Sequence, residues 1–136
     1  FGCCICMSPS FWAGMDSNHN NPMLGFVSIE ESSLLNEVKD KLLSRAVRPR
    51  VYIDWGQCRD SDPQNLVTEA MVEKRGKEMA TFLTETLQYR EVPDAGDSEI
   101  MVVIDHMGGH NELAWNWRLH GALYWLLSGV VPTYSA

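Results

Sequence analysis

From residue 100 the chain reads Ile100-Met101-Val102-Val103-Ile104-Asp105-His106-Met107-Gly108-Gly109-His110-Asn111-Glu112-Leu113-Ala114-Trp115. Its apolar, β-branched start predicts a strand buried on both faces, and its end predicts the beginning of a helix rich in Leu and Trp. Both histidines therefore fall in a strand-to-helix loop. Loops of this kind lie at the carboxyl ends of the strands of an open α/β sheet, where ligands and catalytic groups collect.

This loop makes His110 the first candidate for a catalytic residue. Gly108 and Gly109 can adopt backbone angles that other residues adopt only at a cost, so the chain can carry His110 onto the rim of the sheet. A general base suits that position, and a turn or capping role is the alternative. His106 and His110 are spaced like two metal ligands on a helix, but glycines intervene and no third ligand is nearby. We therefore expect no metal ion and no cofactor.

Strand and helix patterns alternate along the rest of the chain. Strands are predicted at 1–7, 51–56 and 100–104, and helices at 28–43, 65–87 and 112–128. Ser28 as a cap, followed three residues later by Glu31, favours the first helix start. A helix between consecutive strands predicts an α/β fold with a parallel sheet and right-handed crossovers. The last helix is apolar nearly all round, so we expect it to be largely buried.

The length of 136 residues favours a single domain spanning residues 1–136. Three strands form a thin sheet for so much apolar sequence, and Phe1 lies inside what is predicted to be a buried parallel strand. We therefore expect this chain to be the C-terminal part of a longer domain. An N-terminal segment or a partner chain would then complete the sheet.

Composition excludes several classes of partner. The chain carries 18 acidic and 11 basic residues, for a net charge of −7, and no cluster of Lys and Arg stands out from that background. Nucleic acid and anionic membrane surfaces are therefore not expected partners. No apolar stretch approaches the roughly 18 residues of a membrane span, and no signal peptide is recognisable. We expect a soluble protein, with a cytoplasmic location favoured.

The four cysteines are expected to be buried, reduced thiols. Cys3, Cys4 and Cys6 crowd one predicted strand, Cys58 stands apart, and no Cys-x-x-Cys pair occurs. Adjacent Cys3 and Cys4 would point to opposite faces of the strand, which disfavours a disulfide between them.

Three segments resemble a known family. They are Met7-Ser8-Pro9-Ser10-Phe11-Trp12, Arg50-Val51-Tyr52-Ile53-Asp54-Trp55-Gly56 and Gly108-Gly109-His110-Asn111-Glu112-Leu113-Ala114-Trp115. In this order they are similar to the C-terminal half of the putative-esterase branch of the α/β-hydrolases, which includes enterochelin-esterase-like and feruloyl-esterase-like enzymes. The resemblance covers nearly the whole chain. It implies the C-terminal portion of a three-layer α/β-hydrolase-like sheet with flanking helices.

The resemblance also implies a Ser-Asp/Glu-His catalytic triad. His110 matches the family's histidine, which takes the serine proton and returns it to the leaving group. The family's acid follows the strand-then-glycine element at Trp55-Gly56, so Asp60 is the first choice and Asp62 the second. Either aspartate could instead cap a helix or hold a turn. Trp12 is the aromatic residue expected to face the substrate, although a role in the core is the alternative.

The nucleophile is the main departure from the family. No Gly-x-Ser-x-Gly occurs in the chain, and the family's elbow serine would precede the strand at 1–7. The sequence therefore predicts a serine carboxylester hydrolase acting on a small-molecule ester, with its nucleophile upstream of residue 1. On this interpretation the 136 residues alone are inactive. The alternative is a non-catalytic α/β-hydrolase-like module used for binding or assembly.

Overall fold

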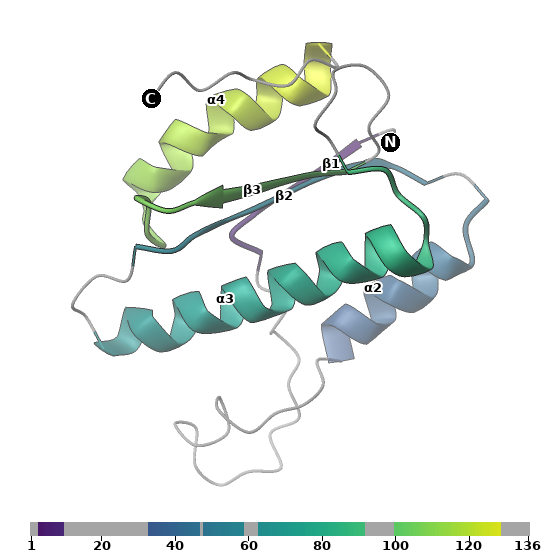
Figure 1. Cartoon of the computed structure of the whole chain (residues 1–136), viewed down its shortest axis with the longest axis horizontal. Coiled ribbons are helices and arrows are strands. Elements are labelled where there is room, and N and C mark those ends of the chain that lie inside the picture. Colours follow the sequence, from purple (N-terminus) through teal and green to yellow (C-terminus); the bar gives the residue numbers. More distant parts are fainter. Residues whose placement is uncertain (1–2, 10–32, 47, 59–62, 92–99, 129–136) are drawn as a thin grey trace, which may run out of the picture.

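A computed structural model describes residues 3–9, 33–46, 48–58, 63–91 and 100–128 (Figure 1). The described strands are β1 (Cys3–Met7), β2 (Arg50–Gly56) and β3 (Ile100–Asp105). They form one parallel sheet in the order β1-β2-β3. Met7 lies opposite Asp54, and Gly56 lies opposite Asp105, so the carboxyl ends of all three strands meet at one edge. The predicted parallel α/β fold is confirmed at this level.

Three helices in the described part of the chain cover the two faces of the sheet. They are α2 (Ser33–Leu43), α3 (Pro63–Thr81) and α4 (Glu112–Ser128), and α3 continues into the π-helical turn η1 (Phe82–Thr86). Helices α2 and α3 lie on one side of the sheet and α4 on the other, giving three layers (Figure 1). The predicted cap at Ser28 and Glu31 lies outside the described residues.

Strand β2 contributes side chains to the apolar clusters on both faces of the sheet because it is the middle strand. Its odd-numbered side chains Val51, Ile53 and Trp55 pack against α2 and α3 in the larger apolar cluster. Tyr52 points to the other face and packs with Trp125 of α4. All seven residues of β2 except Arg50 are buried, as expected for a parallel strand covered on both faces.

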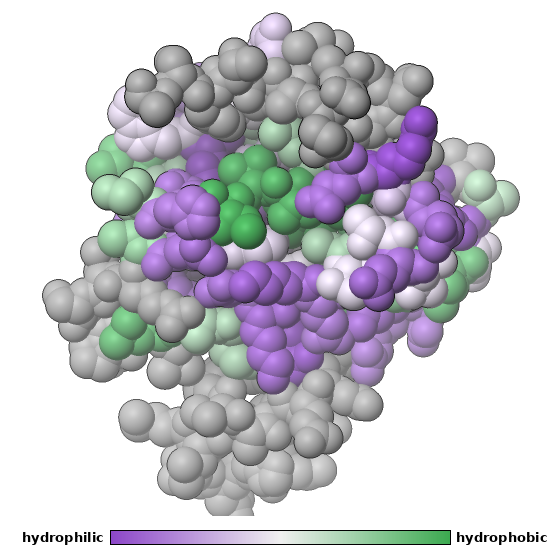
Figure 2. All heavy atoms as spheres, in the orientation of Figure 1, coloured by the Kyte–Doolittle hydropathy of each residue, from purple (hydrophilic) through white to green (hydrophobic). Residues whose placement is uncertain are grey.

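The outer elements are less buried than the sequence predicts. In β3 only the first two residues are buried, and Ile104 is 38% exposed. Helix α4 has an exposed apolar face, with Trp117 71% and Leu127 85% exposed, so the expectation of a largely buried helix is wrong for this chain. Figure 2 shows polar side chains over α3 and apolar side chains at the sheet edge above it. An apolar pattern indicates which side chains could be buried, but burial also needs a neighbouring element.

Gly76 is a packing position in α3. A Cβ at residue 76 would lie 2.8 Å from Cε3 of the buried Trp55 ring, so the missing side chain lets the helix pack directly on β2. We expect Gly76→Ala to destabilise the protein by about 1–3 kcal/mol because overpacking outweighs the gain of about 1 kcal/mol in helix propensity. Urea unfolding would measure the change, with Lys74→Ala on the exposed face of α3 as the control. A stabilised Gly76→Ala variant would contradict this packing.

Candidate active site

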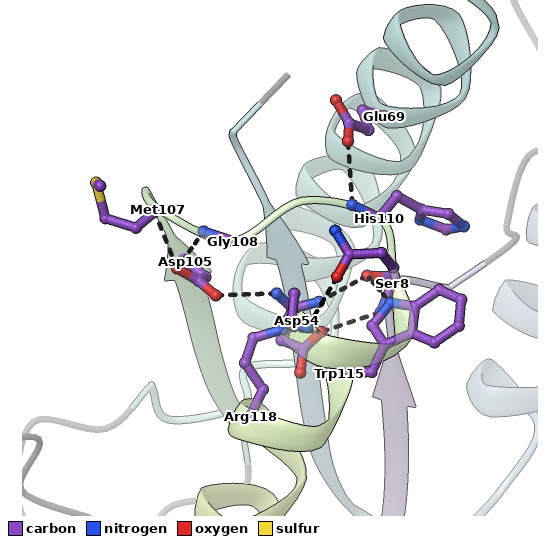
Figure 3. A network of polar contacts seen from close by, with 11 residues as sticks. Ser8, Asp54, Glu69, Asp105, Met107, Gly108, His110, Trp115 and Arg118 are labelled. Atoms are coloured by element: carbon purple, nitrogen blue, oxygen red, sulfur yellow. Dashed lines mark hydrogen bonds and ion pairs between the residues drawn. The ribbon is translucent and has the colours of Figure 1, made fainter. Parts of the chain in front are cut away.

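A single buried guanidinium joins the carboxyl ends of the three strands. Arg118 of α4 is only 3% exposed. Its Nη1 donates to Asp105 Oδ2 at the end of β3 (3.0 Å), and its Nη2 donates to Ser8 Oγ just after β1 (3.0 Å). Its Nε lies 3.2 Å from Oδ1 of Asp54 in β2 (Figure 3). The strand ends are therefore held at one edge of the sheet by charge-assisted contacts.

Ser8 occupies a constrained position in this network. Its φ of 42° is in the left-handed region, which is unfavourable for a residue with a side chain. Its N–H donates to the carbonyl oxygen (2.9 Å) and to Oδ1 (3.0 Å) of Asp54, while its Oγ accepts from Arg118 and from Trp115 Nε1 (3.2 Å). The hydroxyl oxygen is buried and already accepts two hydrogen bonds. Through these hydrogen bonds Ser8 connects the end of β1 to β2 and to α4, and its hydroxyl is not accessible as a nucleophile.

The two aspartates of the network have opposite pKa shifts. Burial raises the pKa of Asp54 above its usual value, and this effect outweighs the attraction of Arg118. Partial burial would also raise the pKa of Asp105, but hydrogen bonds from Arg118 and from the N–H groups of Gly108 and Met107 outweigh it and lower the pKa. Asp105 therefore remains ionised and anchors the start of the histidine loop.

His110 lies in the loop between β3 and α4, as predicted. Its imidazole is half-buried and meets the Trp115 ring edge-to-face, with 5.0 Å between the ring centroids. In Figure 3 the imidazole points away from Glu69. Within the described residues, neither ring nitrogen makes a hydrogen bond. Burial is the largest cause of a lowered pKa for His110 and Arg118 adds to it, whereas Glu69 and Glu112 oppose it. The imidazole is therefore neutral at pH 7 and can accept a proton.

Glu69 of α3 holds the backbone of this loop. Its Oε1 accepts from the N–H of His110 at 3.0 Å. Glu69 is buried, with 3% of the residue exposed, although a charged residue of a surface helix is ordinarily exposed. Its Oε2 has no hydrogen-bond partner within the described part of the chain. The helical pattern gave no signal for this role, because Glu69 resembles the other charged residues of α3.

The loop after β2 runs beside the histidine loop. The N–H of Gln57 donates to Asp105 O (2.8 Å), and the N–H of Cys58 donates to Gly108 O (3.0 Å). A Cβ at Gly56 would collide with Gly108 O, so a residue without a side chain is needed at this approach. Two backbone hydrogen bonds therefore hold the loop after β2 against the end of β3 and the histidine loop.

The glycines of the histidine loop act differently from the expectation. Neither Gly108 nor Gly109 has a φ between +20° and +160°, the region that favours glycine. A Cβ at Gly108 would collide with the Asp105 carboxylate, and one at Gly109 would lie 3.0 Å from Cys58 O. Close packing therefore explains both glycines: Gly108 lies against the Asp105 carboxylate, and Gly109 lies against the loop after β2.

Three of the sequence-predicted site residues lie outside the described residues. They are Asp60, Asp62 and Trp12. The described chain ends at Cys58 on one side of the predicted acid loop and resumes at Pro63 in α3. The structure therefore brings the beginning of that loop to the histidine loop and leaves the choice of acid open.

His106 belongs to a separate polar chain on the surface. Its Nδ1 lies 2.7 Å from Gln57 Oε1, and Gln57 Nε2 donates to Glu73 Oε1 at 3.0 Å. Lys77 forms an ion pair with the same carboxylate oxygen at 2.6 Å. In the part of the chain that the structure describes, no three His, Cys, Asp or Glu side chains form a metal-binding group. His106 and His110 thus have different surroundings despite their spacing.

No helix among the described residues is long and apolar enough to cross a membrane. No protein-family model matches the chain, and no similar protein was found among curated proteins or solved structures.

Proposed function

We propose that the chain is the histidine- and acid-bearing part of a serine-type carboxylester hydrolase with an α/β-hydrolase fold. The observation that carries this proposal is the position of His110. Its half-buried imidazole lies in a loop at the carboxyl edge of a parallel sheet, directly beside the loop that follows the neighbouring strand. The relative order of strand, acid loop, strand and histidine loop is that of the C-terminal half of an α/β-hydrolase.

His110 would act as the general base and then as the general acid. A neutral imidazole accepts the proton of the serine hydroxyl as the hydroxyl attacks the ester carbonyl, and the imidazolium then protonates the leaving alkoxide. Water repeats the sequence on the acyl-enzyme. The lowered pKa of His110 favours this cycle because the imidazole remains neutral to a lower pH than an ordinary histidine.

An aspartate in the loop after β2 would orient His110. Such a carboxylate accepts a hydrogen bond from one ring nitrogen and fixes the tautomer that leaves the other nitrogen free for the serine. We propose Asp60 for this role and Asp62 as the second choice. The hydrogen bond from the N–H of Cys58 to the carbonyl oxygen of Gly108 supports a contact between this aspartate and His110. It fixes the start of the loop after β2 against Gly108, which lies two positions before His110 in the sequence.

The nucleophile is proposed to come from polypeptide outside these 136 residues. Ser8 belongs to the described network, but its hydroxyl oxygen is buried and already accepts hydrogen bonds from Arg118 and Trp115. Within the described residues, β1 has a strand on only one side. A further parallel strand on its other side would bring a nucleophile elbow to the same edge of the sheet as His110. We propose that Trp12 contacts the ester.

Ester turnover tests this function. We expect the complete polypeptide to hydrolyse a 4-nitrophenyl ester with an initial burst of one nitrophenolate per active site, because an acyl-enzyme accumulates. The 136-residue chain should give no turnover above that of its His110→Ala variant. Turnover by the chain alone that is lost in this variant would contradict the proposed division of the triad. A complete polypeptide with neither burst nor turnover would favour a non-catalytic binding module.

A further inference from the structure

Two thiols lie side by side on β1. Cys4 and Cys6 are two residues apart on a strand, so their side chains share one face. Their Sγ atoms are 3.5 Å apart, and neither forms a disulfide. Cys4 is exposed, whereas Cys6 is partly buried and packs against the core beside α2 and α3. The expectation of uniformly buried cysteines is therefore wrong, and the pair is accessible through Cys4.

The pair divides into one thiolate and one thiol. The hydrogen bond between the two thiols lowers the pKa of Cys4 to about 6, against an opposing effect of partial burial. The same hydrogen bond, burial, and the nearby charges of Cys4 and Asp54 raise the pKa of Cys6. At neutral pH Cys4 is therefore mostly the nucleophilic thiolate, and Cys6 remains protonated beside it.

We propose that Cys4 and Cys6 form a thiol–disulfide exchange site that reacts with low-molecular-mass disulfides such as glutathione disulfide. The site is independent of the proposed esterase function. The contact between the two sulfur atoms and the exposure of Cys4 carry the proposal, because a disulfide can reach Cys4 and Cys6 is already in position to resolve the product.

The reaction has two balanced steps. The Cys4 thiolate attacks one sulfur of glutathione disulfide, forming a Cys4–glutathione mixed disulfide and releasing one glutathione thiolate. Cys6 then loses its proton to solvent and attacks the Cys4 sulfur, which releases the second glutathione thiolate and forms a Cys4–Cys6 disulfide. The protein is oxidised by two electrons and glutathione disulfide is reduced by two.

The product disulfide should be easily reduced. Residues two apart on a strand have Cα atoms separated by about 6.4–6.8 Å, at the upper limit of about 6.8 Å for disulfides. Closing the bond requires β1 to shorten locally, and strained disulfides have more oxidising potentials. Because Ser8 follows β1 directly, this distortion would be transmitted to the contacts of Ser8 with Asp54 and Arg118. Oxidation would thereby loosen the edge of the sheet.

Mass spectrometry of the purified chain tests the proposal. The chain is treated with glutathione disulfide at pH 7, quenched with acid and digested. We expect the wild type to lose two hydrogens in the peptide containing Cys4 and Cys6, and dithiothreitol to reverse this loss. Cys6→Ala should instead retain one glutathionyl group on Cys4, and Cys4→Ala should react about tenfold more slowly because it lacks the low-pKa thiol.

Two further measurements test the proposal even if Cys6→Ala folds less stably than the wild type. In the unmodified chain, limiting iodoacetamide at pH 7 should alkylate Cys4 before Cys3 or Cys58. Cys58→Ala serves as the matched control and should form the Cys4–Cys6 disulfide at the wild-type rate. Persistent glutathionylation of wild-type Cys4 without ring closure, or faster alkylation of Cys3 or Cys58, would overturn the proposal.

Discussion

We expect His110→Ala in the complete polypeptide to lower kcat for a 4-nitrophenyl ester by about 10⁴-fold or more, with little change in KM. Without the imidazole, no described side chain in the histidine loop can take the serine proton. In the proposed mechanism the substrate is held mainly by groups other than His110, so KM should change little. Steady-state kinetics and burst amplitude would measure the two effects separately. His106→Ala is the matched control, because His106 contacts Gln57 in the surface network.

The pH dependence provides a second test of His110. The base must be neutral, so kcat/KM should rise as His110 deprotonates. Burial lowers its pKa, and the rise should therefore occur below the usual value of about 6.5 for histidine. In the same assay Asp60→Asn should lower kcat much more than Asp62→Asn. The reverse order would assign the triad acid to Asp62, and retained activity in His110→Ala would reject the proposed base.

Arg118→Ala should destabilise folding by about 3–5 kcal/mol, because it leaves the buried Asp54 carboxylate without its cation. Ser8 and Asp105 would each lose a hydrogen bond as well. This loss is a large fraction of the roughly 5–15 kcal/mol stability of an ordinary domain. Urea unfolding would measure it. Lys41→Ala removes a cation from the exposed pair with Glu37 and should change stability little.

The Arg118→Ala penalty should be larger at pH 7 than at pH 4. Burial already raises the pKa of Asp54 in the folded state, so stability from this group falls as pH rises above its unfolded pKa of about 4. Removing Arg118 raises the folded-state pKa further and strengthens that fall. Asp54→Asn in the Arg118→Ala background should therefore recover part of the loss at pH 7. Equal penalties at both pH values would show that Arg118 stabilises through packing rather than charge.

The order of strands and helices could be predicted because it depends on the spacing of apolar residues along the chain. The β-branched runs ending at Gly56 and Ile104 predict β2 and β3, and the apolar stripe of α3 predicts a helix over nearly its observed length. The position of His110 between β3 and α4 followed from the same pattern. These features depend on residues close together in the sequence.

Burial and the polar network depend on contacts between distant residues. The apolar runs of β3 and α4 were predicted to be buried, but Ile104 and Trp117 are exposed because no described element covers them. The buried role of Glu69 depends on a loop 41 residues away. A sequence signal for Arg118 did exist, since it is the one Lys or Arg in the largely apolar helix α4, and such a charge is buried only when it is paired.

The central claim is that His110 serves a serine nucleophile supplied by another segment of the polypeptide. Fluorophosphonate labelling of the intact native protein, followed by peptide mass spectrometry, tests it most directly. The predicted result is a label on one serine within a Gly-x-Ser-x-Gly sequence outside these 136 residues, with the labelling rate greatly reduced in His110→Ala. An intact protein without a reactive serine, or labelling that is unchanged in His110→Ala, would contradict the account.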